Sequence, residues 1–155
     1  MSAEDWPAVS RIYGEGIAGG NSTFEQTVPD WTAWDSSHLP VCRLVAVHNN
    51  EVVGWAALSP VSKRAVYRGV AEVSVYIVNS AQGLGIGGQL LDEVIRQSEA
   101  EDIWTLQGGI FPENVASLRL FESHGFRRVG VREKIGQMNG KWRDTVLVER
   151  RSALL

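Results

Sequence analysis

The sequence is poor in several features that define whole classes of protein. It has one cysteine, Cys42, so no disulfide can form within the chain, which is typical of a reducing cytoplasm. No apolar run approaches the roughly 20 residues of a membrane-spanning helix, and the first residues do not resemble a secretion signal. With 15 Lys and Arg against 18 Asp and Glu, the chain has no basic surplus for nucleic acid or an anionic membrane. We therefore expect a cytoplasmic protein with neither partner and no metal site, and we expect Cys42 to be a small core residue on a strand.

What is present is the composition of an ordinary globular protein. The chain has 155 residues, of which 44% are hydrophobic and 21% are charged. It contains no internal repeat, low-complexity tract or charged linker. We expect residues 1–155 to form a single domain, long enough to bury about two-thirds of its extended-chain surface.

The spacing of apolar residues predicts alternating helices and strands. Helical spacing predicts a helix from Asp5 to about Ile17, a short helix over 30–38, a long helix over 86–101 and a helix that begins at Asn114 and ends before Gly125. Alternation and turn signals predict strands over 44–47, 52–58, 70–78, 103–110, 129–138 and 141–149. Ser59-Pro60 is expected to stop the second strand. This order predicts an α+β fold with a mixed, mostly antiparallel sheet flanked by helices.

A glycine-rich loop lies between the strand over 70–78 and the long helix. Gly83, Gly85 and Gly87 let successive N–H groups turn toward one point, and a helix start favours negative charge, so the segment is suited to a phosphate. A Walker-type loop requires a terminal Gly-Lys-Ser/Thr, whereas this loop ends in Gly87-Gly88-Gln89. The spacing also fits a dinucleotide fingerprint poorly. The third interpretation is a loop for the diphosphate of an acyl-CoA.

The loop and several further motifs resemble one family. Residues 82–87 are similar to the Q/R-x-x-G-x-G/A signature of the GNAT (Gcn5-related) N-acetyltransferases. In order along the chain, the motifs that resemble the phosphinothricin and methionine sulfoximine branch are Ser22-Thr23-Phe24-Glu25, Arg64 to Tyr67, Ala71 to Ile77, Asn114-x-x-Ser117 and Gly140 to Asp144. The resemblance implies the GNAT fold, acetyl-CoA as cofactor, a homodimer, and transfer of an acetyl group to a small amine. Family members usually begin with a short strand, for which this chain has almost no residues before Asp5.

The same resemblance implies roles for individual residues. Glu72 matches the general base; on a strand it shares a face with Ser74 and Tyr76, and its apolar neighbours would partly desolvate it. The expected cofactor contacts are Val75, Tyr76 and Ile77 through main chain, Gln82, Gly83, Leu84, Gly85, Ile86, Gly87 and Gly88 at the diphosphate, and Asn114 and Ser117 at the pantetheine arm or thiol. The expected acceptor contacts are Phe24, Glu25, Trp31, Arg64 and Tyr67. Trp142 and Asp144 are expected to be structural or interface residues.

One position departs from the family pattern. Where relatives place a Tyr or a His as general acid, this chain has Phe121, which has no proton to donate. Ser117, Tyr76, His124 or solvent are the alternatives, and a thiolate is a tolerable leaving group without an acid. The same departure favours a rival interpretation, a non-catalytic acyl-CoA-binding regulatory module. A second rival keeps the chemistry and changes the acceptor to a protein N-terminus or a polyamine.

Overall fold

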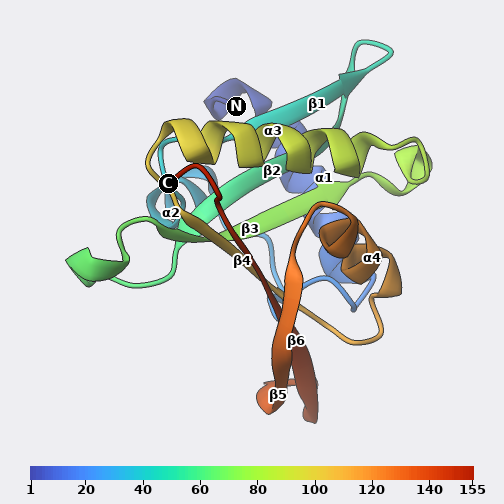
Figure 1. Ribbon diagram of the computed structural model, residues 1–155. Coiled ribbons are helices and arrows are strands. Elements are labelled where there is room, and N and C mark those ends of the chain that lie inside the picture. Colours follow the sequence, from blue (N-terminus) through green and yellow to red (C-terminus); the bar gives the residue numbers. More distant parts are fainter.

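A computed structural model describes residues 1–155 and contains one six-stranded sheet with helices on both faces (Figure 1). The helices and strands in chain order are α1 (Trp6–Ala18), α2 (Trp31–Ser37), β1 (Leu44–His48), β2 (Glu51–Pro60), β3 (Val70–Ile77), α3 (Ile86–Ala100), β4 (Thr105–Ile110), α4 (Val115–Ser123), β5 (Arg127–Met138) and β6 (Lys141–Arg151), with single 3₁₀ turns at 3–5, 65–67 and 79–81. The strand order is β1-β2-β3-β4-β6-β5, and only β3 and β4 run parallel.

The predicted elements are all present, and local signals set their ends. Asp30 caps α2, since its Oδ1 accepts a hydrogen bond from Ala33 N at 2.8 Å. The end predicted for the second strand differs, because Pro60 is the last residue of β2 and pairs with Ala71. β1 begins at Leu44, opposite Ala56, so no β1 residue pairs with Pro60 on the other side of β2, and little is lost where a proline lacks an N–H.

As predicted, no strand precedes α1. The Met1 nitrogen donates instead to Arg43 O at 3.1 Å, directly before β1 begins. β1 is therefore one edge of the sheet, and β5 is the other edge.

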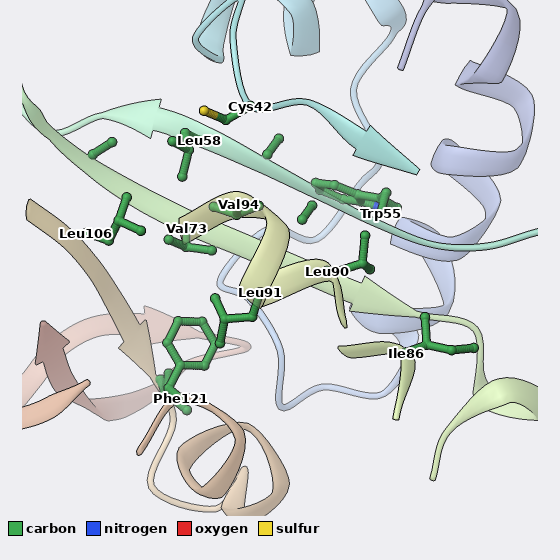
Figure 2. Packing of buried hydrophobic residues seen from close by; sticks show 14 of the residues in the cluster. Cys42, Trp55, Leu58, Val73, Ile86, Leu90, Leu91, Val94, Leu106 and Phe121 are labelled. Atoms are coloured by element: carbon green, nitrogen blue, oxygen red, sulfur yellow. The ribbon is translucent and has the colours of Figure 1, made fainter. Parts of the chain in front are cut away.

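The core lies between α3 and the first three strands. Leu91 and Val94 of α3 are completely buried and belong to one cluster with Leu58 of β2 and Val73 of β3 (Figure 2). Cys42 is buried in this cluster, as predicted, but it lies in a bend before β1, with a φ of +57°, and not on a strand. Burial raises the pKa of its thiol to about 11, which keeps it protonated. None of the helices combines the length and apolarity that a bilayer crossing requires.

Aromatic side chains fill the opposite face of the sheet, beneath α1 and α2. Trp34 of α2 is 1% exposed, and its ring centroid lies 5.6 Å from that of Trp6 and 5.7 Å from that of Trp55. The His38 ring stacks on Trp34 at 4.0 Å, and its Nδ1 lies 2.7 Å from Trp34 O. Burial in this cluster lowers the pKa of His38, so the ring is held neutral.

We expect the free energy of unfolding to decrease as the pH falls below about 6.5. The pKa of His38 is lowered in the folded protein, so the unfolded chain takes up the proton first. The contribution of neutral His38 is therefore fully present above the ordinary pKa and is lost below it. Urea unfolding at several pH values measures this, and His38→Gln should weaken the dependence. His48→Gln, at an exposed histidine of β1, is the control; an unchanged pH dependence in His38→Gln would contradict the prediction.

Candidate active site

The glycine loop adopts a backbone conformation that other residues avoid. Gly83 and Gly85 have φ values of +80° and +78°. A Cβ atom at either position would meet nothing within 4 Å, so these glycines are required for their conformation and not for space. They turn the chain from the end of β3 into the start of α3.

The first turn of α3 presents unpaired donors to this loop. Gly85 is the N-cap and has no side chain, and the first main-chain bond runs from Gln89 N to Gly85 O at 3.2 Å. The N–H groups of residues 86–88 therefore have no partner within the helix, and no acidic residue lies in its first turn. Such a helix start favours an anion.

A cavity of about 660 Å³ opens directly beside the loop. We call it the loop cavity. Its walls are the start of α3, the end of β3, the end of α1 and the start of α4, with these residues among its lining: Glu15, Gly16, Asn21, Ser22, Val75, Tyr76, Ile77, Gln82, Gly83, Gly85, Ile86, Gly87, Gly88, Glu113, Asn114 and Ser117. No Lys or Arg lines it, so its donors for a phosphate are main-chain N–H groups and uncharged side chains.

The loop cavity reaches into a gap between β3 and β4. The two strands pair only from Val70 to Glu72 and then diverge, while β3 stays paired with β2 as far as Ile77 (Figure 1). Val78 N donates to Val53 O at 2.8 Å, toward β2. Because main-chain direction alternates along a strand, the N–H groups of Val75 and Ile77 face the gap. An acyl oxygen placed in this gap could accept hydrogen bonds from these N–H groups, because no neighbouring strand pairs with them.

A second cavity of about 480 Å³ lies on the other side of the gap. We call it the Glu72 cavity. It extends from Glu72 and Ser74 on β3 to Phe24 and Glu25 in the α1–α2 connection, and to Trp34 and His38 at α2. The residues that line both cavities are Asn21, Ser22, Val75, Tyr76, Asn114 and Ser117. The two cavities therefore meet at the divergence of the strands.

Glu72 is the only carboxylate of the sheet in this second cavity. It is half-buried, and its Oε2 accepts a hydrogen bond from Gln107 Nε2 at 3.2 Å. Gln107 is its register partner on β4, at the last pair before the strands separate. The Tyr76 ring lies on the same face of β3, stacked on Trp55 at 4.8 Å, and burial raises the pKa of its phenol. The site thus holds an oriented carboxylate and, four residues further along the same face of β3, a protonated phenol.

This geometry matches a known family. A sequence profile described as the acetyltransferase (GNAT) family matches residues 6–126. The chain belongs to this family. It is therefore an acyltransferase by family, and the cofactor of this family is acetyl-CoA.

Named relatives indicate which branch of the family the chain resembles. The chain is 33% identical to phosphinothricin N-acetyltransferase from Alcaligenes faecalis, over 95% of this chain and 78% of the relative. It is 30% identical to L-methionine sulfoximine/L-methionine sulfone acetyltransferase from Salmonella typhimurium, over 94% and 88%. A GNAT phosphinothricin acetyltransferase from Sinorhizobium meliloti, solved in complex with AcCoA, superposes with a TM-score of 0.89 at 29% identity, over 97% and 85%. Ribosomal-protein-alanine N-acetyltransferase from Brucella melitensis superposes equally well, with 0.89 at 30% identity over 98% and 97%.

The residues present fit acetyl-CoA as a GNAT cofactor. Uncapped N–H groups suit the diphosphate, and the gap donors at Val75 and Ile77 suit the thioester oxygen. Of the residues predicted to contact it, all but one line the loop cavity. The exception is Leu84, which lies outside because the left-handed glycines on either side direct it outward, and it is 55% exposed. A side-chain role for Leu84 in cofactor binding therefore has no support in the structure.

The predicted acceptor residues divide into two groups. Phe24 and Glu25 line the Glu72 cavity, whereas Trp31, Arg64 and Tyr67 line neither cavity. Trp31 turns toward Trp6 and Trp34 on the aromatic face of α2. Arg64 and Tyr67 lie in the exposed β2–β3 connection, where the guanidinium is 5.5 Å from the ring centroid. Acceptor binding by these three residues stays a prediction that the cavities of this chain do not support.

The alternatives for the general acid differ in position and in acidity. Phe121 is 5% exposed and packs on Phe126. His124 lines neither cavity, because its ring faces α3, with Nε2 3.5 Å from Asp92 Oδ1. Tyr76 lines both cavities, but its raised pKa makes the phenol a weak acid. Ser117 and solvent are the remaining routes for a proton to the thiolate.

Several residues at the site were not predicted from the sequence. Four of them belong to no motif and reach the site only through the tertiary structure: Gln107, Thr145, His38 and Asn21. Only the position of Asn21 next to Ser22, in a recognised motif, offered a signal. Asn114 was found, and it both caps α4 through Ser117 N at 3.2 Å and donates from Nδ2 to Asn21 O at 3.0 Å.

We expect Gly85→Ala to weaken acetyl-CoA binding about tenfold, as measured by calorimetry. The left-handed conformation costs an alanine about 1–2 kcal/mol, so the free loop relaxes and binding must restore it. Gly140→Ala is the matched control, since Gly140 has a φ of +74° and equally open space, but lies in the β5–β6 turn. Equal affinities in the two variants would contradict the proposed role of the loop.

Proposed function

We propose that this chain transfers the acetyl group of acetyl-CoA to the primary amine of a small amino-acid analogue such as phosphinothricin or methionine sulfoximine. The names of the Alcaligenes and Salmonella relatives support this acceptor class. The observation that carries the proposal is the meeting of the two cavities where β3 leaves β4, with Glu72 on one side and the loop amides on the other.

Glu72 removes a proton from the acceptor in this proposal. An aliphatic amine is mostly ammonium at neutral pH and must lose a proton before it can attack a carbonyl. The hydrogen bond from Gln107 fixes the Glu72 carboxylate, and both side chains point toward the cavity face of the sheet. The proton passes to Glu72 directly or through a water molecule.

Main-chain donors stabilise the charge that develops on the acyl oxygen. When bound, acetyl-CoA supplies an activated thioester. The N–H groups that face the gap at Val75 and Ile77 need no reorganisation, and one such donor contributes on the order of 3 kcal/mol to lowering a barrier. The thiolate takes its proton from solvent or through Ser117.

We expect Glu72→Gln to lower kcat/KM for the acceptor by about 10²- to 10⁴-fold, because the amide cannot accept the proton. CoA release from acetyl-CoA with phosphinothricin and with methionine sulfoximine measures this, and calorimetry should show unchanged acetyl-CoA affinity. Glu51→Gln, at an exposed carboxylate of the β1–β2 hairpin, is the matched control.

Other outcomes of this assay would support the rival functions. Tight acetyl-CoA binding without CoA release for any amine would favour a non-catalytic module. The lack of a proton donor at Phe121 is the feature that favours this interpretation. Release with a peptide N-terminus alone would favour a protein acceptor, for which the likeness to the Brucella enzyme is the specific observation. Release with polyamines alone would move the acceptor to a different class.

We further propose a homodimer formed through the β5–β6 hairpin. β5 is an edge strand that extends away from the helices (Figure 1), and exposed apolar side chains gather on the hairpin: Val129, Val131, Ile135 and Trp142. Asp144 shapes the hairpin, since its Oδ1 accepts a hydrogen bond from Lys134 N at 2.7 Å. An open, apolar edge of this kind favours strand pairing with another copy.

We expect the wild-type protein to be a dimer by light scattering and Val131→Lys to be a monomer, because a lysine would place a charge in the contact. Val47→Lys is the control, since Val47 is 63% exposed on the opposite edge of the sheet. A monomeric wild-type protein, or equal effects of the two lysines, would contradict this interface.

We propose, finally, that residues 1–155 act as one domain in the cytoplasm. The family match ends at residue 126, and β6 continues the same sheet by pairing with β4, which supports a single unit. The single unpaired cysteine supports a reducing compartment.

A further inference from the structure

The connection between α1 and α2 forms a wall that the two cavities share. This segment contains no regular helix or strand over residues 19–30. Asn21 and Ser22 line both cavities, and Thr23, Phe24 and Glu25 continue along the Glu72 cavity. A segment without its own secondary structure needs contacts from elsewhere to keep one conformation.

Two of the three hydrogen bonds that reach Gly20 and Asn21 from later elements of the chain come from Arg143 of β6, and the third comes from Asn114. The Arg143 Nη1 donates to Gly20 O at 2.7 Å, and its Nη2 donates to Asn21 Oδ1 at 2.8 Å and to Glu113 Oε2 at 3.1 Å. The guanidinium carbon lies 3.8 Å from the centroid of the Phe111 ring, and the side chain is 14% exposed. One planar, poorly solvated cation thus joins β6, the start of α4 and the shared wall.

Two further contacts place the acceptor side of the wall. The Phe24 ring meets the Phe111 ring edge to face, with centroids 4.8 Å apart. Its other side lies against β5 at Gly136, where a Cβ atom would come within 2.6 Å of the ring. Arg143 therefore holds the main chain at Gly20, the side chain of Asn21 and the Phe111 ring, against which Phe24 packs.

We propose that Arg143 is a positioning residue, which holds residues 20–25 as the common wall and so sets Phe24 and Glu25 relative to Glu72. Its catalytic consequence rests on the proposed acetyl transfer. Arg143 also pairs with Glu113, a carboxylate that lines the loop cavity beside the place for a diphosphate. A lysine has a single ammonium and cannot reproduce the three directed contacts of the guanidinium.

Hydrogen exchange on the protein without ligands tests the positioning role directly. In Arg143→Gln, we expect the hydrogen-bonded amides of Gly20 and Glu25 to exchange about tenfold faster or more, because the segment loses the charged group that holds it in place. Exchange in β2 and α3 should stay at the wild-type rate. The control is Arg150→Gln, which removes a comparable ion pair of β6, from Arg150 to Glu99 at 3.0 Å, and touches neither cavity.

Steady-state kinetics with methionine sulfoximine and phosphinothricin test the consequence for catalysis. In Arg143→Gln we expect the acceptor KM to rise about tenfold, while acetyl-CoA affinity changes less than about threefold, because Glu113 is 59% exposed and screened by solvent. Arg143→Lys keeps a positive charge near Glu113, but its acceptor KM should stay close to that of Arg143→Gln. Arg150→Gln should match the wild-type protein in both quantities.

The two readouts separate this inference from the proposed function. If no amine is acetylated, the proposed function fails, and the exchange rates still decide whether Arg143 orders the wall. Wild-type exchange at Gly20 and Glu25 in Arg143→Gln would overturn the positioning role, as would an equal acceleration across the whole sheet. Full recovery of acceptor KM by Arg143→Lys would show that charge, and not the directed contacts, is what matters.

Discussion

The site depends on the pairing of β3 with β4 and on the point at which that pairing stops. The strands share a ladder through Glu72 and Gln107, and beyond this pair each continues with only its antiparallel neighbour. Main-chain N–H groups on β3 are thereby left facing a gap inside the protein, where water is the alternative partner. The same divergence lies where the two cavities meet, with the Glu72 carboxylate in one cavity and the loop amides in the other.

Charge is distributed in an unusual way around this gap. No Lys or Arg lines either cavity, although a diphosphate carries negative charge. Attraction therefore rests on helix and loop amides, whose partial charges are fixed in place by the fold. The carboxylates at the edge of the loop cavity are paired with arginines, Glu15 with Arg11 at 3.6 Å and Glu113 with Arg143 at 3.1 Å. These pairs lower the repulsion that an incoming phosphate would meet.

The elements were largely predictable because their signals are local. Asp30 and Asn114 are caps that act within one turn, and Asn49-Asn50 and Asn139-Gly140 adopt positive φ values at the two hairpin turns. The left-handed glycines of the loop are local in the same sense. The pairing of Glu72 with Gln107 is different, because 35 residues of chain separate the two partners and neither carries a pattern that names the other.

The sequence by itself determined the helices, the strands, the conformation of the glycine loop and, through its motifs, the family, since each depends on backbone preferences over a few residues. Only the tertiary structure decided which side chains reach the site. It placed Phe24 and Glu25 on a cavity, directed Trp31 into an aromatic cluster, and left Arg64 and Tyr67 on an exposed connection. It also gave Arg143 three partners, two of them more than 120 residues away in sequence. The physical reason is that long-range contacts follow from how sheet and helices pack together, and no local preference encodes that packing.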